Sequence, residues 1–167
     1  MSDPDQPFFR FNPRAYESGR AFKASDEPCD HCARPCIWEH TAGVYAVNEA
    51  ILCARCVAAG GLETLFGGRY SFHDVEVENA DPDLEHELLR RTPGVACFNP
   101  FEWPVIDGTP LAFLGYGEEA DLLAIPEVEM AIAAAFEDFG WDAGPSPYAL
   151  IFKQVDGPHY RVVVDLD

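Results

Sequence analysis

Two pairs of cysteines constrain this chain more than any other feature of its sequence. The first pair stands in Cys-Asp-His-Cys at residues 29 to 32, and the second in Cys-Ala-Arg-Cys at residues 53 to 56. Two residues separate the cysteines of each pair, so a tight turn can direct both sulfurs at one ion. The 20 residues between the pairs are enough for a hairpin that lets the pairs meet. The spacing therefore predicts a metal site, with the ligands Cys29, Cys32, Cys53 and Cys56.

Zinc is the metal that this spacing favours. Thiolates are soft ligands that suit Zn²⁺, and four of them close a tetrahedral shell, whereas a catalytic zinc keeps an open position. We therefore expect a structural ion. Two other uses of the cysteines stay open. One is a redox dithiol, which usually lies near a βαβ pattern that is absent here, and the other is an iron–sulfur cluster, whose usual cysteine spacings differ.

The remaining composition predicts a folded protein of the cytosol. Of the 167 residues, 48% are hydrophobic and 13% are aromatic, which is enough for a real core. No apolar run reaches the roughly 18 residues of a membrane span. The start, MSDPDQPFFRFNP, lacks the basic and apolar regions of a secretory signal. Cytosolic thiols stay reduced, so structural disulfides are not expected.

Acidic residues are concentrated in the second part of the chain. Residues 1–71 carry nine Asp and Glu against seven Lys and Arg, whereas residues 72–167 carry twenty against four. Between Thr92 and Phe152 there is no Lys or Arg. Such a surface repels nucleic acid and anionic membranes and attracts a basic protein. The plainer interpretation, that the charge only keeps the protein soluble, stays open.

Apolar periodicity and turn signals predict an α+β fold. We expect an N-terminal treble-clef-like zinc module, packed on a mixed α+β region with a small, mainly antiparallel sheet. Residues 1–70 would form the N-terminal segment and the four-cysteine zinc module, and residues 71–167 an acidic α+β region that makes one compact unit with it.

Individual elements follow from local patterns. The expected helices, hairpin and strands are a helix over 81–94 with Asp81 or Asp83 as its cap, a helix over 125–140 with Phe139 on its apolar side, a hairpin of 36–40 with 44–52, single strands over 70–79 and 110–117, and two strands within 148–167.

No catalytic motif stands out. The chain has no G-x-S-x-G, no P-loop, no glycine-rich dinucleotide fingerprint and no H-E-x-x-H. Adjacent carboxylates at 118–119 and 137–138 are interpreted as solvated faces, so we do not expect an enzyme. Cys36 and Cys97 are interpreted as small buried hydrophobic residues, although Cys36 could compete as a metal ligand.

The order of several short motifs resembles the CbrC family, which is named for a bacterial protein associated with colicin tolerance. These motifs are FNPRAYESGRAF, CDHC, ILCARCVAAGGLETLFGG, RRTPG and PLAFLGYG. The positions that match the family pattern are Cys29, Cys32, Leu52, Cys53, Cys56, Gly60, Arg91, Thr92, Pro93, Gly94, Trp103, Phe113, Leu114 and Gly115. The chain departs from that pattern at Ala54-Arg55, where the family has Pro-Trp, and at 105–108, where a His-Cys is absent.

The resemblance implies protection of a bacterium from a toxin. Immunity proteins that block nuclease toxins are often small, cytosolic and acidic, because they cover a basic substrate groove. Together with the charge, this predicts a protein that binds and neutralises a basic bacterial toxin domain. The candidate contact residues are five acids within ten positions and one aromatic anchor: Asp74, Glu76, Glu78, Asp81, Asp83 and Trp103.

Two alternatives belong to other classes. One is a zinc-binding stress or adaptor protein with no single toxin partner. The other is a treble-clef module that associates with nucleic acid, which the net charge of −18 opposes.

Overall fold

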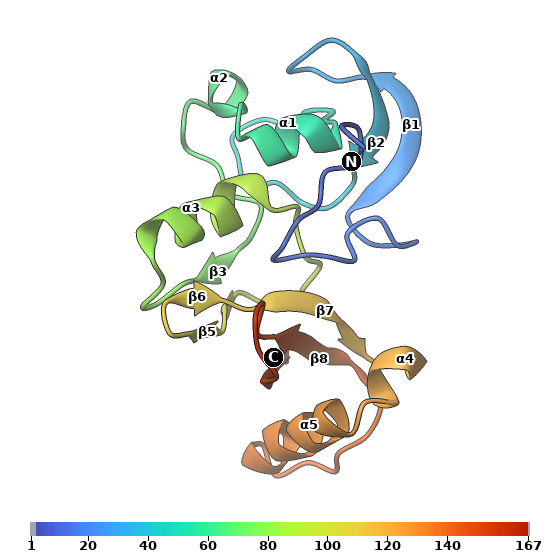
Figure 1. Ribbon diagram of the computed structural model, residues 1–167, viewed down its shortest axis with the longest axis vertical. Coiled ribbons are helices and arrows are strands. Elements are labelled where there is room, and N and C mark those ends of the chain that lie inside the picture. Colours follow the sequence, from blue (N-terminus) through green and yellow to red (C-terminus); the bar gives the residue numbers. More distant parts are fainter. Residues whose placement is uncertain (1–2, 167) are drawn as a thin grey trace. The chain divides into compact units, whose positions relative to one another are not determined.

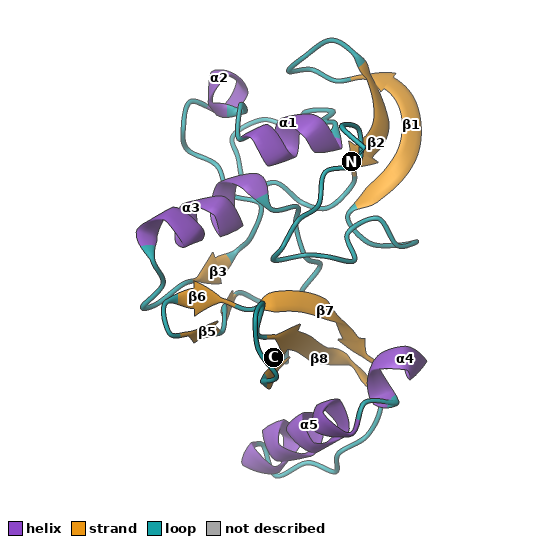
Figure 2. Cartoon of the chain, viewed as in Figure 1, coloured by secondary structure: helices purple, strands orange, loops and turns teal. Residues whose placement is uncertain are grey.

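The computed structural model describes residues 3–166 and confirms a mixed α+β fold with small sheets (Figures 1 and 2). The chain divides into two compact units. The first contains the chain up to Asp74 together with Asp81–Ala96, and the second contains Val75–Ala80 and Cys97–Asp167. The division expected at residue 70 stays a prediction, and residues 1, 2 and 167 at its ends lie outside the described residues.

The first unit contains one hairpin and three helices. Its elements are β1 (Phe22–Pro28), β2 (Pro35–His40), α1 (Ala54–Ala59), α2 (Glu63–Phe66) and α3 (Pro82–Arg91). β1 pairs with β2 in antiparallel register, with Phe22 opposite His40 and Pro28 opposite Pro35.

The hairpin corrects the pairing that we expected from the sequence. Residues 36–40 do lie in a strand, but the partner along its whole length is β1. The 44–52 segment meets this strand only at its end, where the N–H of His40 donates to the carbonyl of Leu52 at 2.8 Å. The segment between the two cysteines of the first pair is itself the connection, because the N–H of Cys29 donates to the carbonyl of Arg34 at 2.8 Å and the N–H of Ala33 donates to that of Cys29 at 2.8 Å. Val47 is 86% exposed, so the alternation in 44–52 does not mark a buried strand face.

The core of the first unit is aromatic next to the hairpin and aliphatic under α1. The ring of Tyr16 stacks on that of Phe22 with centroids 4.9 Å apart, and Phe9 stacks on the same ring at 5.6 Å. Leu52 and Val57 are fully buried in the same cluster. The motif that contains the second cysteine pair is therefore part of this core.

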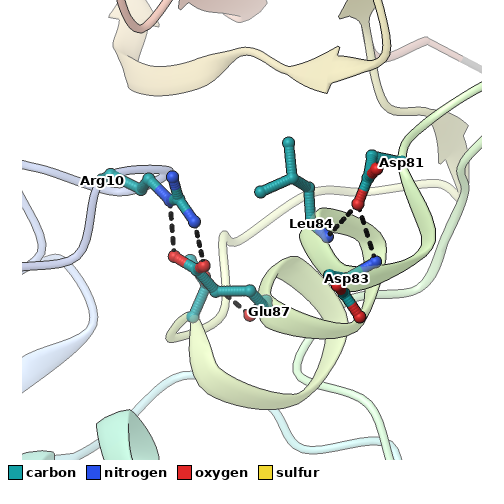
Figure 3. Close-up of polar contacts among 6 residues, drawn as sticks. Arg10, Asp81, Asp83, Leu84 and Glu87 are labelled. Carbon is teal, nitrogen blue, oxygen red and sulfur yellow. Dashed lines mark hydrogen bonds and ion pairs between the residues drawn. The ribbon is translucent and has the colours of Figure 1, made fainter.

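Helix α3 shows the start and stop signals that its sequence predicts. The carboxylate of Asp81 accepts from the backbone N–H groups of Asp83 at 2.9 Å and Leu84 at 3.4 Å, as Figure 3 shows. This is the N-cap arrangement, which satisfies donors that the helix itself leaves unpaired. Glu87 on the same helix receives a two-pronged contact from Arg10 (Figure 3), so α3 holds the N-terminal segment.

The second unit is built on a three-stranded antiparallel sheet. Its strands follow in the order β7 (Ala112–Gly117), β8 (Ser146–Lys153) and β9 (Tyr160–Val164). The smaller elements are a parallel pair, β3 (Val75–Glu76) with β4 (Phe101–Glu102), a hairpin of β5 (Val105–Ile106) and β6 (Thr109–Pro110), and the helices α4 (Ala120–Leu123) and α5 (Pro126–Asp138).

Strand β8 is buried on both faces. Ala149 and Ile151 pack in one cluster with the inward residues of α5, such as Ile132. On the other face, the ring of Phe152 lies 5.0 Å from that of Trp103 and is also close to other aromatic rings. This double burial explains why β8 reads as a continuous apolar run and not as an alternating pattern.

Most of the expected elements are confirmed, and two expectations besides the hairpin pairing are wrong. The helices over 82–91 and 126–138 and the strands β7 and β9 fall within the expected segments, and β8 begins at Ser146, two residues before its expected segment. The strand expected over 70–79 shrinks to Val75–Glu76, because Ser71 Oγ accepts from the N–H of His73 and turns the chain. Phe139 is 54% exposed and lies beyond the last turn of α5. None of the helices in residues 3–166 is long and apolar enough to cross a membrane.

Candidate metal centre

The four paired cysteines converge in the first unit. The sulfurs of Cys29, Cys32, Cys53 and Cys56 all lie within 4.8 Å of one another, and the Cys32 and Cys53 sulfurs are 3.8 Å apart. Four sulfurs at about 2.3 Å from a tetrahedral zinc are separated by about 3.8 Å. Three of the cysteines are buried and Cys32 is half-buried. The cluster therefore has the size and the donor set of a site for one metal ion.

Local structure explains how the chain brings the pairs together. The first pair lies in the connection between β1 and β2. In the second pair, Cys53 is the N-cap residue of α1 and Cys56 lies in its first turn, with the Cys56 N–H donating to the Cys53 carbonyl at 3.0 Å. The N–H of Asp30 donates to the carbonyl of Ile51 at 2.9 Å, and the Ile51 N–H donates to the Asp30 carboxylate at 2.7 Å. This reciprocal pair fixes one cysteine segment against the other.

Backbone and side-chain donors face the sulfurs. The Cys53 N–H donates to Cys29 Sγ at 3.4 Å. Burial opposes ionisation of Cys32, but the backbone N–H of Arg34 and the neighbouring thiols lower the pKa of the Cys32 thiol to about 7. Burial raises the pKa of the Cys53 and Cys56 thiols. Metal binding here must therefore displace protons, since only thiolates are ligands.

A basic residue, Arg55, lies beside the cluster and offsets part of its charge. Arg55, between the cysteines of the second pair, pairs with Asp5 at 2.8 Å, and hydrogen bonding to Cys53 raises the pKa of its guanidinium. A divalent ion held by four thiolates carries a net charge of about −2. The guanidinium and the N–H donors reduce the cost of keeping that charge partly buried.

His31 is a further candidate residue of the site, and no sequence motif identifies it. Its Nδ1 lies 3.2 Å from Cys56 Sγ, so a ring N–H can donate to that sulfur. Hydrogen bonds of this kind orient metal ligands and tune their charge. Gly61 makes room for the ring, because a Cβ at this position would lie 2.9 Å from His31 Cε1. The signal in the sequence is indirect, a histidine inside the first pair and two glycines after α1.

The other cysteines stand apart from this cluster. Among residues 3–166, the group of four does not include Cys36, although Cys36 is buried. Burial raises the pKa of the Cys36 thiol to about 12, which suits a small apolar residue. Cys97 belongs to the second unit.

The candidate partner-binding residues have different environments. The five acids are all exposed; three of them (Asp74, Asp81, Asp83) belong to the first unit and two (Glu76, Glu78) to the second. Trp103 is fully buried, and its indole N–H donates to the carbonyl of Leu111 at 3.0 Å. In this structure Trp103 is a core residue and presents no surface to a partner. The role of the acids stays a prediction.

Comparison with known proteins identifies the family. The model of the Uncharacterised protein family (UPF0167) matches residues 6–156, and therefore both units. The chain belongs to the UPF0167 family. It is similar to UPF0167 protein Mb2317 of Mycobacterium bovis and to UPF0167 protein MT2352 of Mycobacterium tuberculosis. Each is 29% identical to it over 141 residues, which is 82% of this chain and 74% of the relative. No solved structure matches the chain.

The family corrects the resemblance drawn from the sequence. The matching family model and both relatives are UPF0167, and membership of the CbrC family is not supported. The motifs behind that resemblance are short, and paired cysteines or an Arg-Thr-Pro-Gly segment are each common on their own. What they mark in this chain is structural: the cysteine pairs form the cluster, and Thr92 is buried at the end of α3.

Proposed function

We propose that this UPF0167 protein is a zinc-stabilised acidic binding protein. Its first unit holds one structural Zn²⁺ between Cys29, Cys32, Cys53 and Cys56, and its acidic surface binds a basic protein. The observation that carries the proposal is the set of four convergent, largely buried sulfurs. Four thiolates leave no open coordination position, so the ion serves the fold and not a reaction.

A single zinc ion fits the cluster better than the other uses of paired cysteines. The sulfur separation of 3.8 Å between Cys32 and Cys53 is that of neighbouring ligands on one tetrahedral ion. A cubane iron–sulfur cluster would hold its cysteines farther apart, because its irons and sulfides lie between them. The order of a knuckle in a hairpin followed by a pair at a helix start supports a treble-clef-like arrangement. Four reduced thiols suit the cytosol, where we place the protein.

The distribution of charge supports a basic protein as the partner. The second unit carries fifteen Asp and Glu against two Lys and Arg, a net charge of −13, and the first unit has a net charge of −5. Such a field accelerates association with a basic surface and repels nucleic acid. A nuclease-type toxin domain has a basic groove of this kind, and we propose its neutralisation as the biological role to test first.

Metal analysis tests the first half of this proposal. The protein purified without chelators should contain one zinc per chain by elemental mass spectrometry. Cys32→Ser should reduce the zinc content by at least about tenfold at equal chelator concentration, because it removes one of four ligands. Cys97→Ser is the matched control. Stoichiometric iron, or no metal in a folded protein, would contradict the zinc assignment.

Capture from the source bacterium and its toxin-producing neighbours tests the second half. The tagged protein should retain a basic protein at stoichiometric level, and the yield should fall as salt rises from about 0.05 to about 0.5 M, because exposed charges are screened. Replacing the acids at 74, 76, 78 and 83 with lysine should weaken capture. Recovery of nucleic acid, or of a partner whose retention ignores salt, would sink the proposal.

A further inference from the structure

The second unit contains a groove beside α5 that the metal centre does not use. Its walls come from α4, α5 and the loop that leads to β8 (Figure 1), and it encloses about 270 Å³. The lining is largely apolar: Leu123, Ile132, Ala133, Ala143, Gly144 and Pro145, with Glu129 as the charged residue. We propose that this groove binds a cationic amphipathic segment of the basic partner protein. The inference rests on the proposed function and names the chemistry of its partner.

Large apolar side chains are also exposed on α5 and directly after it. Met130 on α5 is 71% exposed, and Phe139 and Trp141 beyond its end are 54% and 53% exposed. They are not needed for packing, because Val128, Ile132 and Phe136 already bury the inner face of α5. Large apolar side chains exposed on one helix and the turn after it are typical of interaction surfaces.

The negative charges of α5 and of the turn after it select the occupant. Glu127, Glu129, Glu137, Asp138 and Asp142 are all exposed, and none forms an ion pair within residues 3–166. A second copy of this chain would bring the same acids against them, and an anionic membrane would add negative charge, so both are repelled. A segment with apolar side chains flanked by lysine or arginine can place its apolar side chains in the groove and its positive charges near these acids.

Glu129 connects the apolar lining of the groove with the acidic surface of α5. It lines the groove one helical turn from both Ile132 and Ala133, so an apolar side chain in the groove places a neighbouring lysine within reach of its carboxylate. An occupant that is only basic would use the rim without the groove, and one that is only apolar would leave the acids uncompensated. The groove therefore favours a segment that is both apolar and basic over one that is only apolar or only basic.

The test uses a fluorescein-labelled peptide of about 18 residues, in which leucine and lysine are arranged in an amphipathic helical pattern. Fluorescence anisotropy measures its binding to the zinc-loaded full chain. A matched peptide replaces each leucine with serine and keeps every lysine. The leucine peptide should bind at least about tenfold more tightly, since the groove rewards buried apolar surface. Equal affinity for the two peptides would overturn the proposal, because it would show attraction by charge alone.

Two variants localise the binding. Ala133→Gln puts a polar side chain into the groove at an exposed helical position, and Glu129→Gln removes one rim charge; Asp156→Asn removes one charge from the exposed turn between β8 and β9. Ala133→Gln should weaken leucine-peptide binding about tenfold and Glu129→Gln about threefold to tenfold, whereas Asp156→Asn should change it less than about twofold. No effect of Ala133→Gln, or a dimer in sedimentation that this variant abolishes, would contradict the proposal.

The same variants separate this inference from the proposed function. Zinc content and the cooperative unfolding of each variant should match the wild type. If Ala133→Gln still captures the natural basic partner at full yield, the groove is not its site, yet binding by the acidic protein stands. If the wild type captures no basic protein and the peptide still depends on Ala133, the proposed function fails and the groove stands.

Discussion

At the scale of single residues, the environment of the cysteines depends on neighbours that carry no metal-binding signature. Gly61 is the clearest case, because its missing side chain leaves the space that the His31 ring occupies next to Cys56. Its backbone does not lie in the left-handed region, so contact and not backbone strain decides what a substitution there would do.

We predict that Gly61→Ala weakens metal binding without changing the ligands. The added methyl group would sit 2.9 Å from His31 Cε1 and push the ring away from the Cys56 sulfur. Loss of such an outer hydrogen bond lowers metal affinity by about tenfold or more. Competition with a coloured zinc chelator measures it. Gly43→Ala, where a methyl group would meet nothing within 4 Å, is the control, and equal zinc affinity of the two variants would contradict the role of His31.

Two buried histidines make the first unit sensitive to acid. Burial lowers the pKa of His40 to about 4 and that of His73 to about 3. His40 Nε2 accepts from the N–H of Gly94 at 3.2 Å, so the neutral ring is the form that fits. An unfolded chain binds these protons near a pH of about 6.5. Stability is therefore complete above about pH 6.5 and falls as the pH drops from there toward about 4.

The expected slope is up to about 1.4 kcal/mol per pH unit for each histidine over that window. Urea unfolding between about pH 7.5 and about pH 4.5 measures it. His40→Phe keeps a ring between Phe22 and Phe72 but does not titrate. The slope should therefore fall, relative to the wild type, by the contribution of one histidine. His86→Gln controls for the loss of a histidine from an exposed site. An unchanged slope in His40→Phe would show that acid acts elsewhere, for example on the thiolates.

At the scale of elements, the sequence predicts the helices whose ends are marked by a capping residue, a proline or charged residues. Helix α3 has a capping aspartate, Pro82 at its first turn and two arginines at its end, and α5 has Pro126 and an amphipathic pattern. The β1–β2 hairpin escapes prediction for a physical reason. Its turn is formed by the segment that contains the first cysteine pair, and neither an Asn-Gly nor another common turn pair marks it. A strand such as β3, which contains two residues, is set by its partner and not by propensity.

We predict that Asp81→Ala destabilises the first unit by about 1 kcal/mol, because it removes the side chain that accepts from the Asp83 and Leu84 N–H groups. The midpoint of urea unfolding measures the change. Asp83→Ala removes an acid of the first turn that is not the cap, and should cost less than half as much. Equal effects would mean that charge, and not capping, is what Asp81 supplies. Binding tests of the acids should therefore leave Asp81 in place.

At the scale of the whole molecule, the sequence predicts the cluster of four cysteines but not the division into units. The spacing of cysteines is a local pattern that reflects coordination geometry, so the four cysteines whose sulfurs converge are predictable from it. The units are interleaved: 75–80 belongs with 97–167, although α3, which follows it in the chain, belongs with the first unit. The pairing of β3 with β4 places residues 75–80 in the second unit. Pairing between segments far apart in the sequence leaves little trace in composition.

The last prediction concerns removal of the metal, to which the two units should respond differently. Structural zinc contributes roughly 10–16 kcal/mol of apparent binding free energy in small modules, which equals or exceeds the total stability of a typical domain. Chelation should therefore unfold the first unit. The second unit has its own core around β8, with Trp103 and Phe152 on one face and Ile132 on the other, and should stay folded.

Hydrogen exchange followed by mass spectrometry distinguishes the units directly. After chelator treatment, peptides from β1, β2 and α1 should lose protection, whereas those from β7, β8 and α5 should keep it. The variant Cys32→Ser should reproduce this pattern without chelator, and Cys97→Ser should not. Loss of protection across both units would show that the second unit depends on the first, because an independent core has no reason to open when the ion of the other unit leaves. Retained protection in β1 and β2 would show that the cysteine cluster holds its hairpin without a metal.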